Sequence, residues 1–105
     1  SDHGEEMYDY RDFAGHAYEK VSPTMSEVPF LVWLSPSYRK FRKGLVFDKN
    51  RVYSSADFIY SVSDLAGINY VDYDDSKSIF STNFVPSERY VGEKKYEDIK
   101  EKFEK

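Results

Sequence analysis

The longest apolar run of the chain covers residues 28–34, where hydrophobic side chains follow one another almost without interruption. The run is rich in β-branched and aromatic residues, which is typical of a strand covered on both faces in a parallel sheet. Pro29 fits such a strand only at its start, where no ladder hydrogen bond is lost. The pattern therefore predicts a buried strand over residues 28–34.

A helix is predicted directly after this strand, over residues 36–43. Ser35 is a favourable N-cap and Pro36 a favourable first helical residue, while Gly44 suits the end of the helix. A strand followed at once by a helix is typical of α/β folds.

A second helix is predicted between Ser54, which caps it, and Gly67, which ends it. Ile68 can fold back as the hydrophobic partner of this C-cap. The acids Asp57 and Asp64 share one face and are interpreted as cap and surface residues. Apolar side chains recur at helical spacing and are expected to form core contacts: Phe58, Ile59, Val62, Leu65 and Ala66.

The rest of the chain has weaker patterns. Residues 1–27 are predicted to be a loop with at most one helical turn, and residues 70–92 to be turn-rich and extended, with a short edge strand near 89–91. Residues 93–105 have a marginal amphipathic helical pattern, which we expect to fray unless it docks.

Composition excludes some classes of function. The 105 residues allow one domain at most, and 40% hydrophobic and 18% aromatic residues suffice for a core. The net charge of −4 disfavours a nucleic-acid partner, and no apolar run is long enough to cross a bilayer. The absence of cysteine excludes disulfides without fixing the compartment.

Charge is unevenly distributed along the chain. Residues 1–27 hold seven acids and two bases, whereas residues 28–52 hold six bases and one acid. A solvated helix face is the simpler interpretation of the basic segment, which includes residues 39–51. Contact with an anionic membrane surface or a lipid phosphate is the alternative.

The candidate chemistry lies in the first six residues, Ser1-Asp2-His3-Gly4-Glu5-Glu6. A carboxylate beside an imidazole suits a divalent metal such as zinc, and Gly4 would let the backbone turn sharply behind the two ligands. Because a zinc site needs three or four ligands, this pair is half a site. On spacing alone, solvated loop residues are the favoured interpretation.

The order of three features resembles a known family: the Ser-Asp-His-Gly-Glu motif, then His16, then the strand before Ser35. Over residues 1 to about 70, and less clearly through Val91, the chain is similar to the C-terminal part of the alkaline phosphatase superfamily. The closest similarity is to the bacterial phosphoethanolamine transferases and their sulfatase-like relatives. The resemblance implies an α/β fold for residues 1–105, as the C-terminal fragment of an alkaline-phosphatase-like sandwich. That fragment would contain a few-stranded, partly parallel sheet, flanking helices, an extended C-terminal segment and a helical tail over residues 93–105.

The same resemblance implies roles for site residues. Asp2 and His3 would bind zinc just past the end of a sheet strand, where ligands collect in open α/β sheets. His16 would be catalytic, donating to phosphoryl oxygens or assisting a hydroxyl group. Relatives often have glycine after this histidine, whereas this chain has Ala17. Glu5 is expected to orient His3.

The implied parent enzyme moves phosphoethanolamine from a phospholipid to a lipopolysaccharide-type sugar or lipid acceptor through a phospho-threonine. Thr24 and Thr82 are the only threonines, and neither follows a strand as the nucleophile should. We therefore expect a C-terminal fragment that is inactive alone, binds zinc weakly and tends to self-associate.

The parent is expected in the bacterial inner membrane with this domain facing the periplasm, while the fragment itself is expected to be soluble. Two alternatives remain open from the residues. One is a sulfatase or phosphoglycerol transferase of the same superfamily. The other, from a different class, is a non-catalytic binding or interaction module.

Overall fold

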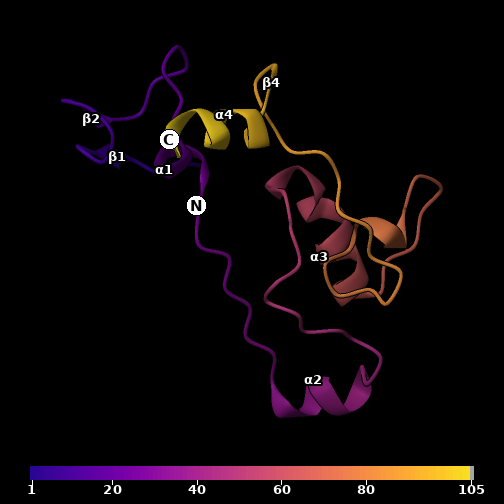
Figure 1. Cartoon of the computed structure of the whole chain (residues 1–105). Helices are drawn as coiled ribbons and strands as arrows, with labels where there is room; N and C mark the ends of the chain where they lie inside the picture. The colour runs from indigo at the N-terminus through magenta and orange to yellow at the C-terminus, as the bar shows by residue number, and fades with distance from the viewer. Residues whose placement is uncertain (105) are drawn as a thin grey trace. The chain divides into compact units, whose positions relative to one another are not determined.

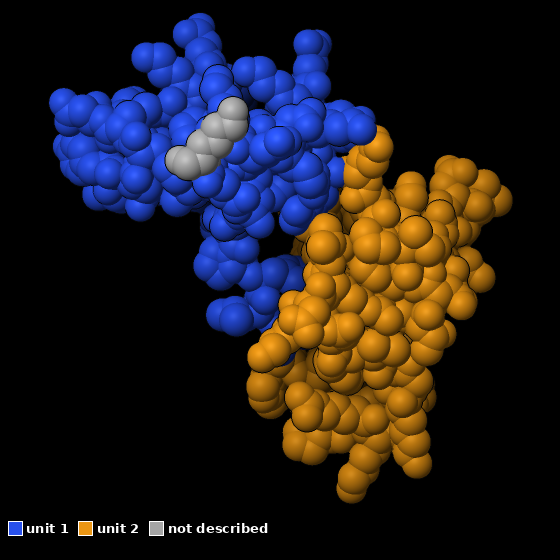
Figure 2. All heavy atoms as spheres, in the orientation of Figure 1, with its two compact units in different colours: residues 1–32, 89–105 blue, residues 33–88 orange. Residues whose placement is uncertain are grey.

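The structure is a computed structural model that describes residues 1–104 (Figure 1). The chain divides into two compact units, which Figure 2 shows in different colours. Unit 1 comprises residues 1–32 and the segment from Arg89 onward, and unit 2 comprises Trp33–Glu88. Within the described residues, none of the helices has the length and apolar character needed to span a bilayer.

Unit 1 is built from two short antiparallel hairpins and two helices. The first hairpin pairs β1 (Glu6–Met7) with β2 (Ala14–Gly15), and the second pairs β3 (Tyr90–Val91) with β4 (Lys94–Lys95). Helix α1 (Pro23–Ser26) is the single helical turn predicted for the first 27 residues, and it packs against α4 (Tyr96–Phe103).

The core of unit 1 lies between these two helices, where Met25, Tyr96 and Ile99 are buried. The C-terminal tail is therefore docked over its described part, because its apolar side chains meet α1. Lys105, the last residue of the predicted tail, lies outside the described residues.

Unit 2 contains α2 (Pro36–Phe41), α3 (Phe58–Ala66) and two 3₁₀ turns, η1 (Ser55–Asp57) and η2 (Asp75–Lys77). The predicted N-terminal caps are confirmed. Helix α2, however, ends at Phe41 with Arg42 as its C-cap, so it stops before the predicted end at Lys43 and Gly44 does not close it. The Ser35 hydroxyl accepts a hydrogen bond from the Tyr38 N–H, and the Ser54 hydroxyl accepts one from Ala56. Gly67 ends α3 with φ of 67°, and the Ile68 N–H donates to the Ser63 carbonyl.

The strand predicted over residues 28–34 is absent from the described structure. This segment is extended but has no sheet partner, and Leu31 and Trp33 are 92% and 80% exposed. A strand needs a neighbour to satisfy its backbone and cover its side chains, and none of the described segments pairs with this one. The helices and antiparallel hairpins are compatible with an α/β fragment, whereas the parallel sheet stays a prediction.

The prediction that the apolar face of α3 forms the core contacts is also wrong. Phe58 and Ile59 are at least half exposed, while Ser61 and Ser63 on other faces are buried. Hydrogen bonding explains this inversion, because Ser61 Oγ lies 2.8 Å from the Tyr53 hydroxyl and accepts from the Ile79 N–H at 3.1 Å. The interior of unit 2 thus combines the buried Phe80 with a polar network in which the serines of α3 find partners.

The two acids of α3 and its preceding turn are not surface residues. Asp57 is buried, and Asp64 accepts hydrogen bonds from Arg42 and from Ser78, each at 2.6 Å. Asp64 therefore joins α2, α3 and the segment after η2 into one unit.

Candidate metal centre

Gly4 anchors the motif at the start of the chain to α1. Its N–H donates to the Met25 carbonyl at 2.8 Å, and a Cβ atom at this position would overlap the Thr24 carbonyl oxygen. Gly4 does not adopt a positive φ. The glycine is therefore needed for a close approach of two backbones, and the sharp turn expected from the sequence is not its role.

The first hairpin brings His16 to the same place. In its register Glu6 pairs with Gly15, so continuing the pairing by one residue sets Glu5 opposite His16. Gly15 has φ of 126°, a conformation that favours glycine and directs the chain just before the histidine.

The base of this hairpin is held by an ion pair between a buried carboxylate and a half-buried guanidinium. Glu6 is fully buried and accepts a hydrogen bond from Arg11 at 3.1 Å. The Arg11 guanidinium also lies over the rings of Phe13 and Phe103, which supplies packing and cation–π attraction. Burying the Glu6 carboxylate is energetically costly unless Arg11 stays paired with it. The pair therefore stabilises the position of β1 next to the motif.

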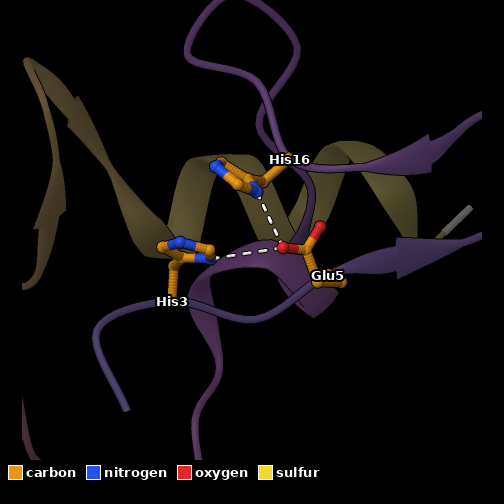
Figure 3. Close-up of side chains that lie close together, drawn as sticks. All are labelled: His3, Glu5 and His16. Carbon is orange, nitrogen blue, oxygen red and sulfur yellow. Dashed lines mark hydrogen bonds and ion pairs between the residues drawn. The ribbon is translucent and has the colours of Figure 1, made fainter.

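Three side chains converge at the resulting site, as Figure 3 shows. Glu5 Oε1 accepts a hydrogen bond from His16 Nδ1 at 2.7 Å and lies 3.7 Å from His3 Nδ1. The two imidazole rings lie 3.9 Å apart between centroids, tilted by 37°. One potential ligand atom from each of the three residues lies within 4.8 Å of the others.

His3 presents its two nitrogens to different partners. Nδ1 lies 3.0 Å from the Gly4 carbonyl oxygen, which can only accept, so this nitrogen carries the proton. On a neutral ring Nε2 then has a lone pair, and it lies 3.6 Å from Asp2 Oδ2. Two acceptors that face each other favour a cation between them.

Asp2 is suited to remain ionised. Its side chain is 90% exposed. A hydrogen bond from its own backbone N–H, followed by the charge of His3, lowers the pKa of Asp2 below its ordinary value. An ionised carboxylate is the form that binds a divalent cation.

Two ligand sets thus share His3: Asp2 with His3 Nε2, and His3 with Glu5 and His16. Both offer the nitrogen and oxygen donors that zinc accepts, and neither provides a closed four-ligand site. The second set would have to replace the hydrogen bond between Glu5 and His16. Glu5 is thus already engaged by His16, whereas the facing acceptor atoms of Asp2 and His3 are not joined by a hydrogen bond to each other.

The structure thus brings His3 and His16 together, while Asp2 contacts His3 from outside the three-residue group. Glu5 differs from expectation, because its hydrogen bond goes to His16 and not to His3. Only the hairpin register reveals that partnership. Because residues 28–34 form no strand, the position of the site relative to a strand end stays a prediction.

Comparison with known proteins shows the family to which this motif belongs. The profile of the sulfatase family matches residues 1–68, which include Asp2, His3, Glu5 and His16. The chain belongs to the sulfatase family. No solved structure gives a significant match.

Among curated proteins, this sulfatase-family chain is similar to two phosphoethanolamine transferases. It is 39% identical over 95 residues to phosphoethanolamine transferase CptA of Salmonella typhimurium. It is 36% identical over 95 residues to phosphoethanolamine transferase EptC of Escherichia coli K12. Each alignment covers 88% of this chain and 16% of the relative, so the chain spans about a sixth of the length of these relatives.

Proposed function

We propose that this chain is the C-terminal part of the catalytic domain of a phosphoethanolamine transferase. The similarity to CptA and EptC over 88% of the chain is the observation that supports this most strongly. The parent would move phosphoethanolamine from a phospholipid to a lipopolysaccharide-type sugar or lipid acceptor. Its threonine nucleophile and remaining metal ligands would come from other parts of the protein, so this chain alone would be inactive.

In this proposal Asp2 and His3 hold a zinc ion. The Nδ1–H bond to the Gly4 carbonyl fixes the His3 ring with Nε2 toward Asp2, and the lowered pKa of Asp2 keeps its carboxylate charged. When bound, zinc would activate the nucleophile and neutralise charge on the phosphoryl group. The close approach at Gly4 keeps the backbone of the motif against α1.

His16 would act as the proton-transfer residue, positioned by Glu5. A carboxylate only accepts, so the 2.7 Å bond places the proton on Nδ1 and leaves Nε2 of a neutral ring free to take another. His16 can therefore remove a proton from the acceptor hydroxyl and return it to a leaving oxygen. Its ring lies 3.9 Å from that of His3, close to the proposed metal.

The exposed apolar segment at residues 28–34 would join a parallel sheet supplied by the rest of the parent protein. Its side chains would then be covered on both faces, as the sequence pattern predicts. Because the donor is a phospholipid, we propose that the parent lies in the bacterial inner membrane with this domain in the periplasm. The solubility of the separate chain stays a prediction.

A segment exchange tests the proposal. We would replace the homologous segment of E. coli EptC with this chain and measure phosphoethanolamine on lipopolysaccharide by mass spectrometry. Transfer by the chimera is expected, because the two segments share 36% identity. His3→Ala should abolish it, whereas Asp12→Asn, an exposed substitution elsewhere in unit 1, should not.

A correctly folded chimera that transfers nothing would contradict the proposal. Hydrolysis of sulfate esters by the same chimera, without phosphoethanolamine transfer, would favour the sulfatase alternative. Activity that persists in His3→Ala would contradict the assigned role of that residue. Activity that is lost equally in Asp12→Asn would show that the substitutions act through folding.

A further inference from the structure

The inner and outer faces of α2 are defined by two hydrogen-bonded side chains. The Tyr38 hydroxyl donates to the Leu65 carbonyl, and Arg42 donates to both the carbonyl and the carboxylate of Asp64. Because Tyr38 and Arg42 are four residues apart, they lie on one helix face, which is turned toward α3. Lys40 then lies on the opposite face, flanked by Arg39 and Phe41.

This outer face combines an exposed ring with unpaired cations. Phe41 is 81% exposed. The Arg39 guanidinium lies 5.7 Å from the centre of the Phe47 ring, which is itself more than half exposed and extends the surface beyond the helix. Among residues 1–104, no carboxylate forms an ion pair with Lys40, Lys43 or Lys49.

The other charged side chains of residues 28–52 form hydrogen bonds or ion pairs within unit 2. Arg42 is paired with Asp64, and Arg51 donates to the carbonyls of Ile79 and Ser81. The one acid, Asp48, accepts a hydrogen bond from the Asn50 N–H. The lysines that remain outward therefore have no carboxylate partner among the described residues, and their field is not cancelled locally.

We infer that this surface, defined by Arg39, Lys40, Phe41, Lys43, Phe47 and Lys49, binds the headgroup region of an anionic lipid bilayer. Basic side chains are attracted to lipid phosphates, and an exposed phenyl ring gains free energy when it enters the boundary between headgroups and acyl chains. A soluble anion would explain the lysines without explaining Phe41. This inference stands apart from the proposed transferase activity, because it involves no residue of the metal centre.

Vesicle binding by the 105-residue chain tests the inference. We expect cosedimentation with phosphatidylglycerol vesicles at low salt and little with phosphatidylcholine vesicles, because only the first surface is anionic. Trp33 is the only tryptophan and is exposed, so its fluorescence should shift to shorter wavelength when the nearby surface binds.

Variants with matched charge locate the binding surface. Lys40→Glu/Lys43→Glu should weaken binding to phosphatidylglycerol at least about thirtyfold, since each basic residue near the membrane contributes about a fivefold gain. Phe41→Ser should also weaken it. Lys20→Glu/Lys94→Glu, with the same change in net charge in unit 1, should weaken it much less. Equal losses in both double variants, equal binding to both lipids, or self-association through Phe41 without lipid binding would overturn the inference.

Discussion

Glu5 accepts a hydrogen bond from His16 Nδ1 at 2.7 Å, across eleven residues and two strands of a hairpin. This contact joins the proposed metal-ligand motif at the start of the chain to the proposed catalytic histidine. It assigns the tautomer of His16, because a carboxylate cannot donate a proton to the ring.

The tautomer of His16 is the first prediction. Nitrogen NMR of the imidazole should show the neutral ring protonated at Nδ1, and Glu5→Ala should shift the population toward the Nε2-protonated form that free histidine favours. His3 should keep its Nδ1 proton in this variant, because its acceptor is the Gly4 carbonyl. A predominantly Nε2-protonated His16 in the unmodified chain would contradict the geometry.

Zinc affinity is the second prediction. The chain should bind zinc weakly by titration calorimetry, because the described residues provide an incomplete ligand set. Asp2→Ala and His3→Ala should remove the binding, while Asp12→Asn should leave it unchanged.

The same titration separates the two ligand sets. If Glu5→Gln removes zinc binding and Asp2→Ala does not, the metal is held by His3, Glu5 and His16. Nanomolar binding by a monomer, lost in Asp2→Ala, would show that the site is complete within these residues and that the proposal of missing ligands is wrong.

A third prediction concerns Gly4. Substitution by alanine would place a Cβ atom against the Thr24 carbonyl, so we expect a loss of about 2 kcal/mol in the free energy of unfolding. Gly44→Ala is the matched control, because a Cβ there meets nothing within 4 Å and the residue has no positive φ. The control should be neutral or stabilise by up to about 1 kcal/mol. Equal effects in the two variants, measured by urea denaturation, would exclude the close-approach explanation.

A fourth prediction concerns Asp64. Alanine at this position leaves Arg42 and Ser78 without their shared acceptor, so unit 2 should lose about 2 kcal/mol of stability. Asp64→Asn keeps one acceptor oxygen and should cost less. Asp72→Ala, at an exposed site, is expected to be neutral in the same denaturation experiment. A loss for Asp72→Ala as large as for Asp64→Ala would argue against this network.

The fifth prediction is a pH dependence from Tyr96. Burial first, and then its hydrogen bond to Glu27, raise the pKa of Tyr96 above the ordinary value of 10.0. Above pH 10.0 the unfolded chain releases this proton while the folded chain retains it. The contribution to stability is therefore fully present below that pH and falls as the pH rises through the raised pKa.

Tyr96→Phe should accordingly lower stability by about 1.5 kcal/mol at neutral pH, because it removes a hydrogen bond to a carboxylate. It should also reduce the alkaline loss of stability. Tyr18→Phe, at an exposed position, should change neither quantity. An unchanged alkaline profile in Tyr96→Phe would contradict the assignment.

The sequence by itself determined the features that depend on a few neighbouring residues. The Ser35 cap, the Gly67 helix end and the single turn of α1 follow from local hydrogen bonding and backbone freedom, which neighbouring residues decide. The Ser-Asp-His-Gly-Glu motif and the apolar segment before Ser35 together indicated the family, because their residue types and order are specific in combination.

Tertiary structure alone decided which surfaces are buried and which distant side chains meet. The apolar face of α3 was expected to be buried. Ser61 is buried instead, because it forms hydrogen bonds with Tyr53 and with the backbone of Ile79. The pairing of Glu5 with His16 depends on hairpin register, which residue spacing does not reveal. Burial and long-range pairing depend on the partners that surround a segment in space, and a pattern within one segment does not encode those partners.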